Sequence, residues 1–324
     1  MNNLPTYLLK HKYNLMVNSI NNIKVNQDDQ VIQDDKVKQY INVNQVKEAN
    51  QLNNIDLMNL FIKVNDDNKI YRDDKIRKNN TIDNLIYRVV VICPTYNRRR
   101  FMSQLIYQFN YQDYPKKYLQ MVILDDSLIS NSDIFEDIDD IDLKSRIHYV
   151  YDYDKKTIGA KRNILNKIAL SLDAEYIVCF DDDDYYPSNR VSAGVKCLSN
   201  SGYKIGGTST LPIYYPNLNE IYVIGPFINK IYRGHATNGT LVYHIDYLKN
   251  NSYDDNDTRK EEVKFLRNFN CNLIQIPYTD VMLCISHQTN TVCKTDLIIN
   301  GKKLDKKLND IITDYYLYDF FRKI

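Results

Sequence analysis

Four short apolar runs alternate with segments of helical periodicity between residues 88 and 180, and this alternation constrains the fold more than any other feature. The runs are Arg88–Cys93 (RVVVIC), Leu119–Leu124 (LQMVIL), Arg146–Tyr151 (RIHYVY) and Tyr176–Phe180 (YIVCF). Continuous apolar runs of this length are typical of strands buried in a parallel sheet. Strands that alternate with helices at this spacing predict an α/β fold with a largely parallel central sheet.

Two of the intervening segments carry apolar residues at helical spacing. We expect one helix over Arg99–Gln112, with Phe101, Leu105 and Phe109 on one face. We expect a second over Gly159–Leu172, with the inward residues Ile164, Leu165, Ile168, Ala169 and Leu172. In open α/β sheets, ligands bind outside the carboxyl ends of the strands. The polar residues that follow the apolar runs are therefore the candidate site residues.

Residues 1–86 differ in composition from the rest of the chain. The part between Asn18 and Asn80 is rich in Asn, Gln, Asp and Lys, and it contains no Gly or Pro. We predict an N-terminal extension or small appendage at 1–86, the main domain at 87–295 and a C-terminal helical tail at 296–324.

The charges of the chain nearly cancel, because 42 basic residues stand against 41 acidic ones. A nucleic-acid partner is not expected, since it would require a strongly basic face. No apolar run approaches the ~20 residues that span a bilayer, so no integral membrane segment is expected. The first glycine is Gly159, which excludes a Walker A loop or a glycine-rich dinucleotide loop upstream of it.

The six cysteines form no CxxC pair, and most lie in apolar stretches. We therefore expect reduced core residues and not a disulfide or zinc framework. The N-terminus lacks the unbroken apolar stretch of a signal peptide, so a cytoplasmic location is expected. The excess of Asn, Ile, Lys and Tyr is typical of an AT-rich genome. A large DNA virus or a protist would fit, and for a virus the place of action would be the host cytoplasm or the virion.

The strongest local signal is a run of four aspartates, Asp181–Asp184, directly after the fourth apolar run. Neighbouring carboxylates about 4 Å apart repel by roughly 4 kcal/mol at an effective dielectric constant of 20. A divalent cation would relieve this repulsion, and Mg²⁺ or Mn²⁺ suits oxygen ligands. If the backbone stays extended, Asp181 and Asp183 project alike and form an Asp-x-Asp pair. The alternative is a solvated acidic turn.

A second signal lies at the start of the helix expected from Gly159. Its first turn carries Lys161 and Arg162. A helix N-terminus with two cations suits a pyrophosphate. The alternative is the ordinary solvated face of an amphipathic helix.

In this order, the segments resemble the GT-A glycosyltransferases of family 2. The order is strand–PTYNR (94–98), strand–DDS (125–127), an IGxKRN helix (158–163) and strand–DDDDYYPxxR (181–190). The resemblance covers about residues 88–290. It implies a GT-A fold and a metal-dependent, inverting transfer of a hexosyl or N-acetylhexosaminyl group from a nucleotide-diphosphate sugar.

The resemblance also implies which residues bind the donor. Those that border the nucleotide base and ribose would be Pro94, Thr95, Tyr96 and Arg98. Either Asp125 or Asp126 would hold the uracil or the ribose. Lys161 and Arg162 would face the ribose and the phosphates, with Asp181 and Asp182 completing the donor site.

A Mn²⁺ or Mg²⁺ ion is the cofactor that the resemblance implies. Asp181 and Asp183 match the family's metal-binding Asp-x-Asp. His287 resembles a late histidine that ligates the metal in many GT-A enzymes, and a neutral imidazole suits Mn²⁺. The alternative for His287 is a structural role.

Downstream, Glu261-Glu262 resembles the family's Glu-Asp pair, whose second acid is the base of inverting members. Glu262 is one methylene longer than Asp, so the base is left open between Glu262, Glu261 and the nearby Asp257. The alternative is an exposed acidic helix start. Gly206–Leu211 and Gly225–Leu241 fit the stretch that lines the acceptor side.

The expected partners are a nucleotide-sugar donor, with a UDP-sugar favoured, and a glycan, protein or lipid acceptor. Two other functions stay open. A nucleotidyltransferase that forms nucleotide sugars also uses an α/β sheet with acidic metal ligands, but it usually has a glycine-rich loop after its first strand, and PTYNRRR has no glycine. The other is a non-catalytic nucleotide-sugar-binding protein with a transferase fold.

Overall fold

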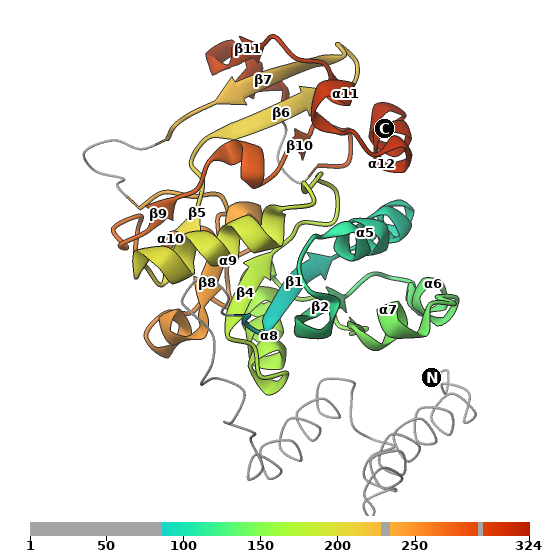
Figure 1. The fold of residues 1–324 in the computed structure, drawn as a ribbon, viewed down its shortest axis with the longest axis vertical. Helices are drawn as coiled ribbons and strands as arrows, with labels where there is room; N and C mark the ends of the chain where they lie inside the picture. The colour runs from blue at the N-terminus through green and yellow to red at the C-terminus, as the bar shows by residue number, and fades with distance from the viewer. Residues whose placement is uncertain (1–85, 228–233, 291–293) are drawn as a thin grey trace, which may run out of the picture. The chain divides into compact units, whose positions relative to one another are not determined.

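The computed structural model describes residues 86–227, 234–290 and 294–324, which Figure 1 draws as a coloured ribbon. The predicted extension at 1–86 therefore lies outside the described residues, except for its last one. Within the described ranges, no helix is long and apolar enough to cross a membrane.

The central sheet has seven strands in the order β3-β2-β1-β4-β8-β5-β9. The first four are the strands that the sequence predicts, namely β1 (Val89–Thr95), β2 (Leu119–Asp125), β3 (Ile147–Tyr151) and β4 (Tyr176–Cys179). β1 pairs in parallel with β2 and β4, and β2 pairs in parallel with β3, which confirms the parallel core. Every residue of β1 and β4 is buried, as expected for strands covered on both faces.

Three shorter strands complete this sheet. β8 (Val242–His244) pairs antiparallel with β4 and with β5 (Ile205–Gly207). β9 (Ile274–Gln275) pairs in parallel with β5. The sheet is therefore mixed, with parallel pairs in the majority.

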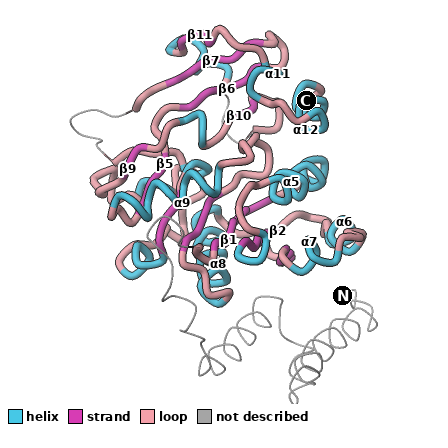
Figure 2. The backbone as a smooth tube through the Cα atoms, viewed as in Figure 1, coloured by secondary structure: helices cyan, strands magenta, loops and turns pink. Residues whose placement is uncertain are grey.

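Helices cover both faces of the sheet. Alternate residues of a strand point to opposite faces, so neighbouring residues of β1 pack against different helices. Val91 packs in one apolar cluster with α5 (Arg99–Tyr111) and α9 (Arg190–Ser201). Ile92 packs in the other cluster with α8 (Ile158–Ser171). Figure 2 shows these helices in cyan around the magenta strands. Each fully buried aliphatic side chain stabilises the fold by about 1.5–3 kcal/mol.

Both predicted helices are confirmed to within a residue at each end. Phe101, Leu105 and Phe109 are wholly buried along α5. α8 begins after Thr157, whose side chain accepts a hydrogen bond from the Ala160 N–H and caps the helix.

A second sheet has the strand order β10-β6-β7-β11. Its strands are β6 (Leu211–Tyr215), β7 (Glu220–Ile224), β10 (Cys284–Ile285) and β11 (Lys302–Leu304). β11 lies in the segment predicted as a helical tail, which also holds α11 (Leu308–Ile311) and α12 (Tyr315–Arg322). The sequence did not indicate β11 because its residues are KKL and its two lysines are exposed.

The remaining α-helices of the described residues are α6 (Ser132–Glu136), α7 (Ile141–Ser145) and α10 (Glu262–Phe265). The five described cysteines are free, and four of them are buried. Cys293 lies outside the described residues.

Candidate active site

Polar residues from separate segments meet at the carboxyl ends of the parallel strands. Thr95 ends β1 and is in register with Asp125, which ends β2. Thr95 Oγ1 donates a hydrogen bond to Asp182 Oδ2 at 2.5 Å, and this contact joins the ends of β1 and β4. The candidate residues therefore share one edge of the sheet, as the strand pattern predicts.

Each aspartate of the acidic run contacts a different partner. The pairs are Asp181 Oδ1 with Arg162 Nη2 (2.8 Å), Asp182 Oδ2 with Thr95 Oγ1 (2.5 Å), Asp183 Oδ2 with His287 Nε2 (3.0 Å) and Asp184 Oδ1 with Ile285 N (2.8 Å). Asp182, Asp183 and Asp184 are at most 9% exposed. The run is therefore not a solvated acidic turn.

The backbone of the run does not stay extended. Asp182 and Asp183 form a turn, and Asp181 and Asp183 point to different partners. The four carboxylates therefore have different hydrogen-bond partners. In the described part of the chain, no group of three or more His, Cys, Asp or Glu side chains is placed to hold a metal ion.

Asp182 and Asp183 have pKa values shifted in opposite directions by their neighbours and their burial. Burial and the charge of Asp183 raise the pKa of Asp182 well above its usual range. Burial acts on Asp183 too, but the His287 hydrogen bond and the charges of Lys294 and Arg98 outweigh it and lower the pKa of Asp183 to about 2. Asp183 is therefore the ionised member of this pair.

Both acids at the end of β2 are buried and fully engaged by the protein. The carboxylate of Asp125 accepts hydrogen bonds from the N–H and hydroxyl of Ser127, from Asn131 Nδ2 (2.7 Å) and from the Tyr149 hydroxyl (2.6 Å). Asp126 accepts from Lys161 Nζ at 2.7 Å and from the backbone N–H of Lys156 at 2.7 Å.

The two cations of α8 are buried and paired with site acids. Lys161 Nζ also donates to the carbonyl oxygen of Thr95 at 3.0 Å. Arg162 Nη2 contacts Asp181, and Arg162 Nε lies 3.4 Å from Glu261 Oε1. Nε and Nη1 of Arg162 are both buried without a hydrogen-bond partner among the described residues. Arg162 thus links the acidic run to Glu261, one of the candidate bases.

The start of α8 is filled by the protein itself. The Gly159 N–H donates to the carbonyl oxygen of Asp257 at 3.1 Å. A Cβ at Gly159 would lie 1.8 Å from the carbonyl oxygen of Asp254, so only glycine allows this loop to approach. The predicted phosphate site at this helix start is therefore occupied by the chain around Asp254 and Asp257.

Arg98 lies beside the acidic run. Its guanidinium is 3.7 Å from Asp182 and 3.5 Å from Asp183, and it donates to Thr289 Oγ1 at 2.5 Å. Tyr96, two residues earlier, has the ammonium of Lys155 4.0 Å from its ring centre, and Pro94 is buried within β1.

His287 is held by neighbours on both of its ring nitrogens. Nε2 faces Asp183 Oδ2 at 3.0 Å and Asn290 Nδ2 at 2.8 Å, and Nδ1 is 3.0 Å from Thr289 Oγ1. Asn290 Oδ1 accepts the backbone N–H of His287 at 2.7 Å, which fixes the orientation of the Asn290 amide. Its Nδ2 therefore faces Nε2 and donates to Asp183 Oδ2 at 3.3 Å.

Asp183 Oδ2 and His287 Nε2 lie 3.0 Å apart, and this carboxylate and imidazole are the pair that would hold a divalent cation here. Mg²⁺-type sites commonly take one or two carboxylates from the protein and the rest from phosphates and water.

Glu262 differs from Glu261 in that its carboxylate has no hydrogen bond or ion pair from another described residue. Burial, and secondarily the charge of Glu261, raise its pKa to about 7. Glu261 is buried and accepts from Asn238 Nδ2 at 3.0 Å, while Asp257 packs at the start of α8. A half-buried carboxylate with a pKa near 7 suits a general base.

Residues 90–255, about half of the chain, match the family model of glycosyl transferase family 2. The chain belongs to this family. It is a family 2 glycosyltransferase with a GT-A fold. A search among curated proteins found no match to it.

Among solved structures, the glycosyltransferase is similar to TarS 1-349 of S. aureus in complex with UDP-GlcNAc, with 17% identity over 63% of this chain and 60% of that one and a TM-score of 0.47. It is also similar to the mannosyltransferase PcManGT of Pyrobaculum calidifontis in complex with GDP-Man and Mn²⁺, with 14% identity over 73% of this chain and 67% of that one and a TM-score of 0.49. The chain thus spans about 60% of the TarS structure.

The sequence analysis assigned no role to several residues of the glycosyltransferase site. Thr289 and Asn290 orient His287, and Lys294 lies 3.5 Å from Asp184. A threonine and an asparagine just after a histidine are a weak signal, and the Lys294 contact has no local signal at all. Asn238, which holds Glu261, lies in the predicted acceptor-side stretch. Of that stretch, residues 228–233 lie outside the described ranges.

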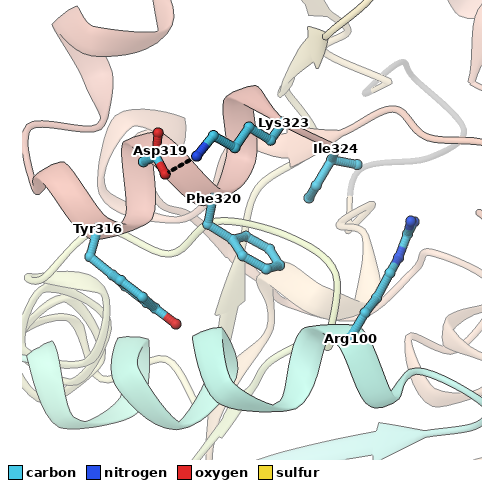
Figure 3. Close-up of a pocket in the computed structure, with 6 residues that line it drawn as sticks. All are labelled: Arg100, Tyr316, Asp319, Phe320, Lys323 and Ile324. Atoms are coloured by element: carbon cyan, nitrogen blue, oxygen red, sulfur yellow. Dashed lines mark hydrogen bonds and ion pairs between the residues drawn. The ribbon is translucent and has the colours of Figure 1, made fainter.

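A surface pocket of the glycosyltransferase lies between α5 and α12, apart from the acidic run. Figure 3 shows Tyr316 and Phe320 of α12 pointing toward α5, with Arg100 on the facing helix. Arg100 Nη2 also donates to Thr289 Oγ1 at 3.3 Å, so the pocket borders the His287 segment. None of the predicted site residues lines it.

Proposed function

We propose that this glycosyltransferase moves a hexosyl or N-acetylhexosaminyl group from a UDP-sugar to a hydroxyl group of a glycan, protein or lipid acceptor, in a metal-dependent reaction with inversion at the anomeric carbon. The ion-pair chain Asp181–Arg162–Glu261 carries the proposal, because it links the acidic run to the acid pair that holds the free carboxylate of Glu262. Under this proposal, the acidic run at the donor and the base at the acceptor belong to one site.

The cations of the site suit a diphosphate. Arg98 is 13% exposed in its side chain, and the buried Arg162 has an unpaired Nη1. Both would share the charge of the leaving nucleoside diphosphate. A bound Mn²⁺ or Mg²⁺, which Asp183 and His287 would hold, would neutralise the same charge.

Glu262 supports the transfer step. Its ionised carboxylate would take the proton of the acceptor hydroxyl, whose oxygen then bonds to the anomeric carbon. The bond between that carbon and the phosphate oxygen breaks, and the nucleoside diphosphate leaves with the electron pair. One displacement inverts the anomeric configuration.

The deciding experiment compares wild type with Asp183→Ala over a panel of nucleotide sugars with and without Mn²⁺. We expect Mn²⁺-dependent release of UDP from wild type and at least about 100-fold less from Asp183→Ala, since the loss removes both a ligand and the partner of His287. The exposed Asp139→Ala is the matched control.

The product distinguishes the alternatives. Pyrophosphate instead of UDP would favour a nucleotidyltransferase, and donor binding without turnover would favour a non-catalytic binding protein. Wild-type turnover in Asp183→Ala would overturn the proposed site.

A further inference from the structure

The segment after β4 runs antiparallel to the segment that carries His287. Tyr185 and Leu283 exchange two backbone hydrogen bonds, of 3.0 and 2.8 Å. One residue earlier on the first segment, Asp184 Oδ1 accepts the Ile285 N–H at 2.8 Å. One residue earlier again, Asp183 meets His287. The contact between Asp183 and His287 therefore depends on the register of the two segments, which the pairing of Tyr185 with Leu283 fixes.

Lys294 contacts both Ile285 and Asp184. Its Nζ donates to the carbonyl oxygen of Ile285 at 2.9 Å and lies 3.5 Å from Asp184 Oδ1. The backbone of Lys294 is fixed in turn, because its carbonyl oxygen accepts the Tyr215 hydroxyl of β6 at 2.8 Å. Both polar backbone groups of Ile285, two residues before His287, are thus bound by the members of one ion pair.

The ion pair is nearly dry, since the side chains of Asp184 and Lys294 are 3% and 14% exposed. Taking two charges out of water costs several kcal/mol each, and apolar residues of similar volume commonly stabilise a fold as well or better. The buried Asp184–Lys294 pair is therefore better explained by the backbone position that it specifies at Ile285 than by a gain in stability. A slip of one residue would bring Ser286 or Gln288 into the place of His287.

We propose that Asp184 and Lys294 are positioning residues, whose ion pair fixes Ile285 and thereby keeps the imidazole of His287 against Asp183. Asp184, the fourth aspartate of the run, then helps to hold His287 against Asp183, the third. The catalytic meaning of this arrangement rests on the proposed function, but the arrangement itself is measured without substrate.

The test uses the full chain with labelled histidines, free of metal, and follows the side-chain NMR signals. The His287 signal is assigned by its loss in His287→Gln. Asp184→Asn keeps the shape and an oxygen for the Ile285 N–H but removes the charge, and Lys294→Met removes the opposite charge. Lys303→Met, which removes a lysine from the exposed pair with Glu220 on β11, is the matched control.

We expect the His287 signal to move in Asp184→Asn, in Lys294→Met and in the double variant, because each of them lacks the ion pair, and to stay unchanged in the control. Mn²⁺ affinity, measured by electron paramagnetic resonance, should fall about 10- to 100-fold in each single variant.

An unchanged His287 signal in Asp184→Asn would overturn the proposal, and if Lys294→Met does not fold, Asp184→Asn decides alone. A wild-type chain that transfers no sugar, but whose His287 signal responds as expected, would overturn only the proposed function.

Discussion

Replacing Glu262 with Gln should stop sugar transfer and at the same time stabilise the fold above neutral pH. Burial and the charge of Glu261 raise the pKa of Glu262 from 4.5 to about 7. A rise of this size means that the folded state disfavours the ionised carboxylate by about 3 kcal/mol. A Gln side chain has the same shape without the charge, so the substitution removes this cost.

The gain in stability depends on pH in a defined direction. Because the pKa of Glu262 is higher in the folded chain, its stabilising contribution is fully present below 4.5 and is lost as the pH rises through about 7. At about pH 8.5 the variant should therefore be more stable by about 3 kcal/mol. At about pH 5.5 the folded wild type is mostly protonated, and the difference should shrink to about 1 kcal/mol.

Urea unfolding at the two pH values measures the difference directly. The exposed Glu136→Gln at the end of α6 is the matched control, and it should leave the free energy of unfolding unchanged at both. A variant that is no more stable than wild type at pH 8.5, or a gain that does not change with pH, would refute the reasoning from burial.

Three further predictions follow from contacts of the site. The kcat/KM for transfer should rise with pH and level off above about 7, because Glu262 acts when ionised; a flat profile between pH 5.5 and 8.5 would place the base elsewhere. Lys161→Met leaves Asp126 buried and unpaired, and urea unfolding should show a loss of about 3–5 kcal/mol; a loss below about 1 kcal/mol would contradict the pairing. Gly159→Ala places a Cβ 1.8 Å from the Asp254 carbonyl oxygen and should cost about 1–3 kcal/mol, seen as a lower Tm; an unchanged Tm would show that the loop packs elsewhere.

The parallel half of the central sheet could be predicted because its strands are specified locally. A run such as RVVVIC is apolar on both faces, and a strand covered on both sides is its stable environment. The other half could not, since β9 has two residues and β5 contains Gly206 and Gly207. A Cβ at Gly206 would lie 2.7 Å from Leu198 Cδ1, so packing and not strand propensity selects this segment.

The place of the candidate site could be predicted, but its pairings could not. Charged residues directly after apolar strands must lie at the sheet edge, which located Asp183 and its neighbours. The contact of Asp183 with His287 joins residues 104 positions apart, and only the family resemblance, which made both of them metal ligands, pointed to it. The sequence also cannot show that Arg162 is buried between Asp181 and Glu261, because burial of a cation depends on acids supplied by distant segments.

The contacts of the acidic run also imply an order of assembly. The partners of Asp182, Asp183 and Asp184 lie 87, 104 and 101 positions away, on opposite sides of the run in the chain. Until those segments arrive, adjacent carboxylates repel one another and keep their water, while the strands before them can already pair. We expect the site to close last during folding and to open first under mild denaturation. A ligand that binds only the closed site would then report on the whole fold, although it touches one edge of one sheet.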